Sequence, residues 1–258
     1  MCFDHDSAPP IPVVSGGSVD QEDLVLTASD GNEFAAFAAR ADGARLGVVI
    51  LPDVRGLYRF YEELALRFAE HGYDAVAIDY FGRSAGIAKR PNDWDFWPHV
   101  EQTTLAGIKA DTAAAIGYLR GDSRRAPRPD LPVIVVGFCF GGSNAWHQAA
   151  NELGIAGAIG FYGHPDRPGF PTEAPPVIER VVDVSCPILA LMGGADPGIP
   201  TDESDRFRLA LTEAGIDNEI IVYPGAPHSF FDRKQDDFLS ESADAWSRVL
   251  AFAEAASR

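Results

Sequence analysis

The sequence predicts an α/β protein built on a mostly parallel sheet, and two patterns carry that prediction. Short apolar runs alternate with longer segments of helical period along most of the 258 residues. This alternation is typical of βαβ units, in which a helix connects two parallel strands. Ahead of these units, Asp30-Gly31 separates two further apolar runs, which favours a tight antiparallel hairpin. We therefore expect helices on both faces of a central sheet that begins with an N-terminal antiparallel hairpin.

The expected elements follow one another in a regular order. The hairpin strands fall at residues 24–27 and 33–39. Three of the intervening helices, at 58–71, 103–120 and 201–214, are each followed by a glycine that can end a helix, and a last helix covers 236–256. The apolar runs that predict buried strands are 47–51, 75–78, 133–136, 156–161, 188–191 and 219–223.

The remaining segments set the expected domain limits. Residues 1–22, with Pro9, Pro10 and Pro12, lack periodicity and predict an extended or mobile lead-in. Residues 23–258 are expected to form one domain, because α/β folds of roughly 200 to 250 residues commonly do. Three polar or proline-rich stretches, 84–98, 122–132 and 164–176, are predicted to be irregular. The first and third follow strands, where parallel sheets bind their ligands, and are therefore candidate lids.

Composition excludes several classes of partner. The 38 acidic against 21 basic side chains give a formal charge of −17, which disfavours nucleic acid and anionic lipid. The sequence has no apolar run long enough for a membrane span and no secretory signal pattern. Its three cysteines are too few for a disulfide scaffold, so we expect a cytoplasmic protein. No histidine or cysteine pair has metal-ligand spacing, and neither a metal nor a cofactor is expected. The oligomeric state is left open.

A candidate nucleophile lies where the strand at 133–136 runs into Gly137-Phe138-Cys139-Phe140-Gly141-Gly142. The pattern predicts a sharp strand-to-helix turn with Cys139 at its apex and small neighbours that make room for the strained backbone. At a helix N-terminus a thiolate is stabilised, and the N–H of Phe140 can stabilise an oxyanion. A free cysteine is also commonly a small buried hydrophobe, and Cys139 taken alone allows that interpretation.

The rest of the chain favours the catalytic interpretation. Asp196 directly follows the strand at 188–191, and His228 directly follows the strand at 219–223. The order of nucleophile, acid and histidine, each just beyond a strand, is that of α/β-hydrolases. His228 would take the thiol proton, and Asp196 would orient the imidazole. A rival nucleophile, Ser84 in Gly82-Arg83-Ser84-Ala85-Gly86, matches G-x-S-x-G, but Pro91 and Pro98 break the helix that should follow.

Together these motifs resemble the dienelactone hydrolase family, over a region from about residue 23 to the C-terminus. The resemblance implies an α/β-hydrolase fold and hydrolysis of a small lactone or ester, such as the enol-lactones of chlorinated-aromatic degradation. The resemblance also implies that this reaction needs no cofactor. By resemblance, Asp53 would help to activate the thiol, the N–H of Val54 would complete the oxyanion hole, Arg83 would bind a substrate carboxylate, and Tyr162 would line the pocket. His164, just beyond Tyr162, is a further candidate for the pocket.

Two departures from the family pattern bear on the substrate. The residue at Asp53 is usually glutamate, which is one methylene longer. The family has a second arginine four residues after the histidine. Here that position holds Asp232, so Arg233, Arg55 or Arg167 would have to replace the missing arginine. A larger aromatic substrate could meet Trp94, Phe96 and Trp97, which ordinary packing explains equally well.

Three alternatives therefore remain open. The chain could be a broader carboxylesterase or thioesterase acting on neutral substrates. It could be a non-catalytic ligand-binding protein of the same fold. It could also use Cys139 as a redox sensor, although no resolving cysteine lies near it.

Overall fold

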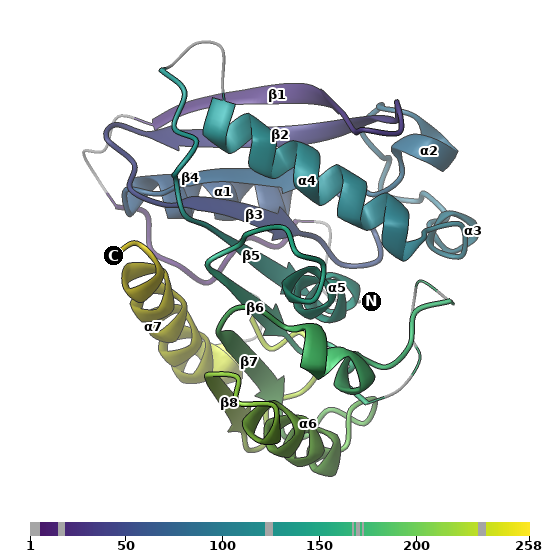
Figure 1. Ribbon diagram of the computed structural model, residues 1–258, viewed down its shortest axis with the longest axis vertical. Coiled ribbons are helices and arrows are strands. Elements are labelled where there is room, and N and C mark those ends of the chain that lie inside the picture. Colours follow the sequence, from purple (N-terminus) through teal and green to yellow (C-terminus); the bar gives the residue numbers. More distant parts are fainter. Residues whose placement is uncertain are drawn as a thin grey trace.

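The computed structural model describes residues 6–14, 19–121, 126–166, 168, 171, 173–231 and 236–258. Within them the strands form one eight-stranded sheet in the order β1-β2-β4-β3-β5-β6-β7-β8 (Figure 1). β2 pairs antiparallel with β1 and β4, and every other pair is parallel. The predicted sheet and its N-terminal hairpin are confirmed.

The strands explain the apolar runs of the sequence. Every residue of the five central strands is buried, which is why those segments read as continuous apolar runs. The edge strand β1 begins at Val19, inside the predicted lead-in, because its pairing with β2 continues to the Val19–Ala41 pair. The strands are β1 Val19–Thr27, β2 Glu33–Ala41, β3 Gly47–Leu51, β4 Asp74–Ile78, β5 Val133–Phe138, β6 Gly157–Phe161, β7 Ile188–Gly193 and β8 Asn218–Tyr223.

Helices cover both faces of the sheet. In Figure 1, α4, α5 and α6 lie in front of it and α1 lies behind. The rings of Phe68 in α1 and Trp246 in α7 are 5.0 Å apart, so these two helices share a face. The α-helices are α1 Arg59–Glu70, α2 Gly82–Ala85, α3 Trp97–Val100, α4 Leu105–Gly121, α5 Phe140–Ala149, α6 Thr201–Glu213 and α7 Leu239–Ala256. Two 3-10 helices are η1 Val177–Asp183 and η2 Asp236–Phe238.

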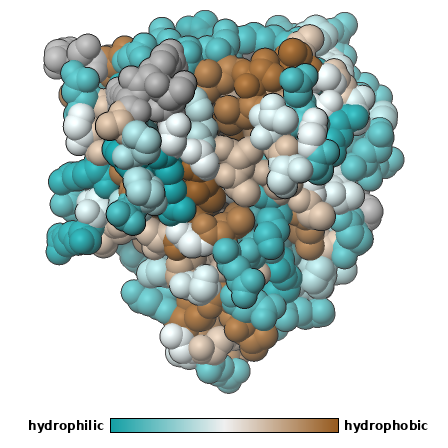
Figure 2. Space-filling view, turned by 45° about the horizontal axis from the view of Figure 1, so that its top comes forward, coloured by the Kyte–Doolittle hydropathy of each residue, from teal (hydrophilic) through white to brown (hydrophobic). Residues whose placement is uncertain are grey.

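The segment 84–98 is less irregular than expected. It contains the end of α2 and the start of α3, two single helical turns. Such short helices carry no amphipathic period and therefore could not be predicted from the sequence. Among the described residues, no helix has the length and apolarity needed to cross a bilayer. On the face seen in Figure 2, hydrophilic and hydrophobic residues are interspersed.

Two glycines allow β3, β5 and α5 to approach one another closely. A Cβ on Gly137 would lie 1.9 Å from the carbonyl oxygen of Gly141, and a Cβ on Gly141 would lie 2.1 Å from that of Leu51. Neither position can hold a larger residue without moving backbone. The expected need for small residues around the turn after β5 is thus confirmed.

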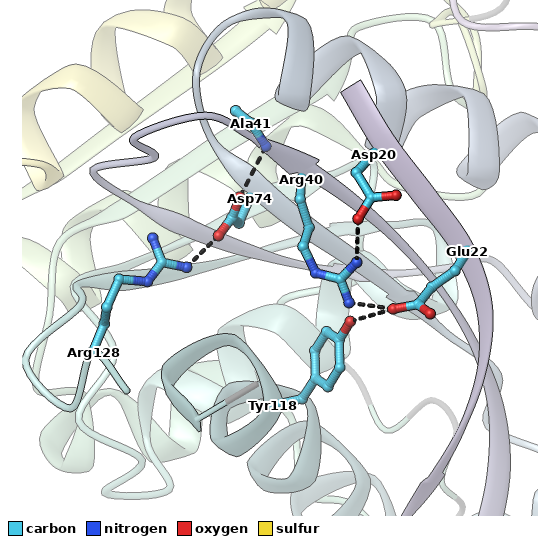
Figure 3. A network of polar contacts seen from close by, with 7 residues as sticks. All are labelled: Asp20, Glu22, Arg40, Ala41, Asp74, Tyr118 and Arg128. Atoms are coloured by element: carbon cyan, nitrogen blue, oxygen red, sulfur yellow. Dashed lines mark hydrogen bonds and ion pairs between the residues drawn. The ribbon is translucent and has the colours of Figure 1, made fainter. Parts of the chain in front are cut away.

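A polar network ties α4 to the hairpin (Figure 3). Arg40 on β2 pairs with Asp20 and Glu22 on β1, and its guanidinium lies 5.2 Å from the ring centroid of Tyr118 on α4. The Tyr118 hydroxyl donates to Glu22. Because Arg40 is almost fully buried, its two carboxylate partners offset the cost of removing its charge from water. The sequence alone did not predict this network.

Candidate active site

The turn after β5 has the strained geometry expected of a nucleophile elbow. Cys139 has φ 56° and ψ −114° and is the N-cap residue of α5. Such a conformation costs a non-glycine residue about 1–3 kcal/mol and persists only where the surroundings impose it. Here the N–H of Cys139 donates to the carbonyl of Phe161 on β6 at 3.0 Å. The side chain is half-buried rather than sealed in the core.

Tyr80 is an unexpected neighbour of this turn. Its ring packs edge-on against that of Phe140, with centroids 5.0 Å apart, and its hydroxyl donates to the carbonyl of Pro52 at 2.8 Å. Burial, assisted by the charges of Asp53, Asp79 and Cys139, raises the pKa of Tyr80 well above its ordinary value. The phenol is therefore neutral and braces the loop after β3 against the start of α5.

Asp196 and His228 meet beyond the ends of β7 and β8. Nδ1 of His228 lies 2.5 Å from Oδ2 of Asp196, whose side chain is 2% exposed, whereas that of His228 is 28% exposed. Burial alone would raise the pKa of Asp196. The hydrogen bond and charge of His228, the N–H of Gly198 at 2.8 Å and the charge of His164 together hold it below its ordinary value. Asp196 is therefore ionised and fixes the Nδ1 edge of the imidazole, which leaves Nε2 outside this hydrogen bond.

Tyr162 and His164 approach this pair from the end of β6. Tyr162 has φ 38°, another strained conformation, and its ring centroid lies 4.9 Å from that of His228. His164 is held to α5 by Ser143, whose hydroxyl accepts from the His164 N–H at 2.8 Å and donates to its carbonyl at 3.2 Å. Tyr162 thus lies against the imidazole of His228, and His164 lies near enough for its charge to lower the pKa of Asp196.

Asp53 is held by an arginine two residues away. Oδ2 of Asp53 lies 2.8 Å from Nη2 of Arg55, and both side chains are almost completely buried. Oδ1 accepts from the N–H and Nε of Arg55, and the Asp53 N–H donates to the hydroxyl of Tyr61. Arg55 therefore neutralises the carboxylate that the resemblance assigns to thiol activation. Val54, whose N–H the resemblance assigns to the oxyanion hole, lies between Asp53 and Arg55 in the chain.

Arg83 also has internal partners. Its guanidinium lies 2.6 Å from Oδ2 of Asp111, which is fully buried, and 2.7 Å from Oδ2 of Asp30. Burial lowers the pKa of Arg83, but the hydrogen bonds of Asp111 and Asp30 outweigh it and raise the pKa. A substrate carboxylate would have to compete with two carboxylates already present. The other proposed cations, Arg233 and Arg167, lie outside the described residues, as does Asp232.

Ser84 has a histidine partner that sequence reasoning missed. Its Oγ lies 3.0 Å from Nδ1 of His99, 15 residues further along the chain. The ring of His99 stacks on Trp94 with centroids 4.8 Å apart. Ser84 itself lies in the single helical turn α2 and not at a strand-to-helix elbow. The aromatic side chains of this region pack on one another, and nothing in the local sequence indicated the pairing of Ser84 with His99.

The three residues predicted as nucleophile, acid and base follow β5, β7 and β8, which are parallel members of one sheet. They therefore lie at the same edge of that sheet, where parallel α/β proteins place their sites. A strained residue at a strand-to-helix turn, with an acid–histidine pair after later strands, defines an α/β-hydrolase.

Comparison with known proteins gives the family. The sequence model of the dienelactone hydrolase family matches residues 34–257, and the chain belongs to that family of hydrolases. A relative from Yersinia pestis, provisionally named carboxymethylenebutenolidase, is 29% identical over 232 residues, which cover 86% of this chain and 84% of the relative. A relative of the same provisional name from Escherichia coli K12 is 29% identical over 231 residues, covering 86% and 82%.

Solved structures agree with this assignment. A protein from Klebsiella pneumoniae, described provisionally as a dienelactone hydrolase, superposes with a TM-score of 0.79 at 26% identity and covers 92% of this chain and 99% of its own. A metagenomic protein described as a dienelactone hydrolase-like promiscuous phosphotriesterase superposes with a TM-score of 0.71 at 19% identity, covering 92% and 99%. The second likeness concerns the fold alone.

Proposed function

We propose that this chain is a cysteine-nucleophile hydrolase that cleaves a small lactone or ester through an acyl-thioester intermediate. One observation carries the proposal: Cys139 occupies the strained turn after β5, and Asp196 and His228 form a 2.5 Å pair at the same edge of the sheet. A turn of this kind exposes its side chain to substrate and places it at the N-terminus of a helix. The pair supplies the base that such a nucleophile needs.

The reaction would begin with transfer of the thiol proton of Cys139 to His228. The sulfur then attacks the carbonyl carbon, and the N–H groups of Val54 and Phe140 stabilise the oxygen that becomes negative. The tetrahedral intermediate collapses, the C–O bond breaks, and the leaving oxygen takes the proton from the imidazolium. In the second half, His228 takes a proton from water and the resulting hydroxide attacks the thioester carbonyl. The C–S bond then breaks, the imidazolium returns its proton to the sulfur, and the carboxylic acid leaves the free thiol.

Asp196 has an electrostatic role in both halves of this cycle. Its pKa is held below the ordinary value by the same hydrogen bond that orients His228, so it stays charged when the imidazole takes up a proton. Tyr162 and His164 would line the pocket beside that ring, and Arg233 is a proposed substrate contact. Asp53 would act on the thiol only if its pairing with Arg55 opens or if a water relays its charge.

A second candidate differs in the charge of the substrate. A carboxylesterase or thioesterase for neutral substrates is favoured by the two ion pairs that Arg83 makes with Asp30 and Asp111. In the enol-lactone hydrolase of aromatic degradation, Arg83 would instead receive the substrate carboxylate. The free thiols Cys139 and Cys186 suit a reducing, cytoplasmic location for either activity.

Thiol labelling combined with turnover measurements tests the proposal. Burial raises the pKa of the Cys186 thiol to about 12, so that cysteine is an internal control that iodoacetamide should not reach. We expect peptide mapping to find Cys139 alkylated and Cys186 unmodified, with activity lost in proportion to Cys139 labelling.

Variants give the second arm of this test. Cys139→Ala should be inactive on an enol-lactone and on p-nitrophenyl acetate, whereas Ser84→Ala should retain activity on both. Rapid acid quenching followed by mass spectrometry should detect the acyl group on the peptide that contains Cys139. Turnover by Cys139→Ala would reject the mechanism.

A further inference from the structure

The segment of residues 86–96, which we call the strap, follows α2 and is fastened by one arginine. Nη2 of Arg90 lies 2.7 Å from Oδ2 of Asp79 and donates to the carbonyl of Gly86, and Nη1 donates to the carbonyl of Ala85. The guanidinium also lies 4.8 Å from the ring centroid of Trp94. Asp79 and Arg90 have side chains only 3% and 5% exposed, so this ion pair is buried.

The first part of the strap, residues 87–90, does not close fully against the hairpin. A cavity of about 200 Å³ lies between the strap and the hairpin, and its lining includes Leu24 and Ala36 on one side and Ile87 and Arg90 on the other. Arg90 and Lys89 attach this part of the strap by ion pairs with Asp79 and Asp23, whereas Trp94 further along packs on the ring of Phe81. The Tyr58 hydroxyl adds a polar contact by donating to the carbonyl of Pro91 at 3.0 Å.

The other side of Asp79 meets the loop that follows β3. A Cβ on Gly56 would lie 2.4 Å from Oδ1 of Asp79, so the carboxylate lies directly against this glycine, which has φ 81°. Oδ1 makes no hydrogen bond of normal geometry, and the N–H groups of Leu57 and Phe81 act on the carboxylate as dipoles that lower its pKa. The N–H of Gly56 donates to the carbonyl of Asp53 at 3.0 Å and closes a tight turn. Val54 is inside that turn.

We propose that Asp79 is a positioning residue: its carboxylate, held by Arg90 of the strap, fixes the turn that presents the Val54 N–H to the oxyanion. This inference rests on the proposed function, in which Val54 is an oxyanion donor. It adds that the strap and the turn at residues 53–56 are coupled through the buried ion pair of Asp79 and Arg90. Asp79 touches neither substrate nor reacting atoms in this role.

The electrostatics of Asp79 make the coupling sensitive to pH. Burial raises the pKa of Asp79 to about 6, although Arg90 acts in the opposite direction. Arg90 faces the carboxylate from the strap, and Lys89 and Asp23 line the same cavity. The charge of Asp79 also raises the pKa of Tyr58, at the start of α1, and of Tyr80, just after β4. As pH falls through about 6, Asp79 takes up a proton, the ion pair with Arg90 is lost, and the turn is released.

Arg90→Met tests this coupling without altering Asp79 or the turn itself. Without its cation, buried Asp79 should stay neutral to higher pH, so the acid limb of the kcat profile should move to higher pH. At pH 7, kcat for p-nitrophenyl acetate should fall about 10-fold to 100-fold with KM within twofold, because loss of one oxyanion donor acts on the transition state. Arg90→Lys should restore most of the loss, and activity of Arg90→Met should partly recover at pH 9.

Lys89→Met is the matched control. Lys89 is the adjacent strap cation, but it is exposed and pairs with Asp23 and Glu62, so its removal should leave kcat and the pH profile unchanged. If Arg90→Met fails to fold, Trp94→Leu removes the ring beside the guanidinium and should lower kcat about twofold to fivefold with the same shift of the acid limb. A wild-type kcat and acid limb in either variant overturns the positioning role.

The failure of this inference can be told from failure of the proposed function. If Cys139→Ala is inactive while Arg90→Met behaves as wild type, only the positioning role of Asp79 is rejected. If Cys139→Ala turns over substrate, the cysteine mechanism is rejected and the inference is rejected with it.

Discussion

Nδ1 of His228 lies 2.5 Å from Oδ2 of Asp196, although 32 residues separate them in the chain. Each follows a strand, and β7 and β8 are neighbours in the sheet, so parallel pairing brings the two loops together. The contact assigns Nδ1 to the carboxylate and leaves Nε2 as the ring nitrogen that can exchange a proton with a nucleophile. The proposed mechanism depends on this orientation.

Asp196→Asn tests that orientation. The amide can present its N–H to Nδ1, which favours the wrong tautomer, and it no longer stabilises the imidazolium. We expect kcat to fall about 10³-fold to 10⁴-fold while KM changes little, because the loss acts on the transition state. Steady-state kinetics on p-nitrophenyl acetate provide the measurement, with thermal unfolding as the control for folding. A loss smaller than 10-fold would show that the carboxylate does not support the base.

Gly141→Ala tests the steric requirement at the elbow. A Cβ there would lie 2.1 Å from the carbonyl of Leu51, so backbone must move and the turn carrying Cys139 should be displaced. We expect a loss of about 2–4 kcal/mol in the free energy of unfolding, together with most of the activity. Gly117→Ala in α4 is the matched control, because its Cβ would meet nothing within 4 Å. That variant should gain up to about 1 kcal/mol in urea unfolding, and similar behaviour of the two would contradict the steric account.

Arg83→Gln separates the two candidate substrate classes. If Arg83 serves only Asp30 and Asp111, kcat/KM should change less than threefold for an anionic ester and for its neutral analogue alike. Stability should still fall by about 1–3 kcal/mol, because buried Asp111 loses its cation and keeps only the hydrogen bond from the Asn32 amide. If Arg83 receives a substrate carboxylate, kcat/KM should fall at least 10-fold for an anionic ester and not for its neutral analogue. Matched charged and neutral esters, assayed on both proteins, decide between these outcomes.

His147 should make folding stability depend on pH. Burial, helped by the charge of Arg180, lowers the pKa of His147 to about 4. The unfolded chain, in which histidine titrates near pH 6.5, therefore binds more protons in this interval, and stability should decrease as pH falls from about 6.5 to 4. The expected decrease is on the order of 1–3 kcal/mol.

The measurement is the midpoint of urea unfolding at several pH values in this range. His147→Gln should be less stable at pH 7, because it changes a buried side chain, but it should lack this part of the pH dependence. An identical slope in both proteins would assign the acid sensitivity to other groups.

The elbow illustrates what local sequence encodes. Gly137 and Gly141 are required by close backbone contacts within and beside one turn, so their spacing around Cys139 was enough to predict the strained apex. The strands were predictable for a related reason, since residues buried on both faces of a sheet must be apolar throughout. Short turns such as α2 and α3 were missed, because a single helical turn carries no periodic signal.

By itself, then, the sequence determined the parallel sheet, the position of Cys139 at the turn between β5 and α5, and the placement of Asp196 and His228 just beyond strands. Only the tertiary structure decided which polar side chains meet: Arg83 with Asp30 and Asp111, Asp53 with Arg55, Asp79 with Arg90, and Ser84 with His99. The physical reason is the range of the interactions. Backbone strain and burial are imposed on neighbouring residues and leave a local pattern, whereas a side-chain pair depends on which distant segments the sheet order brings within a few ångströms.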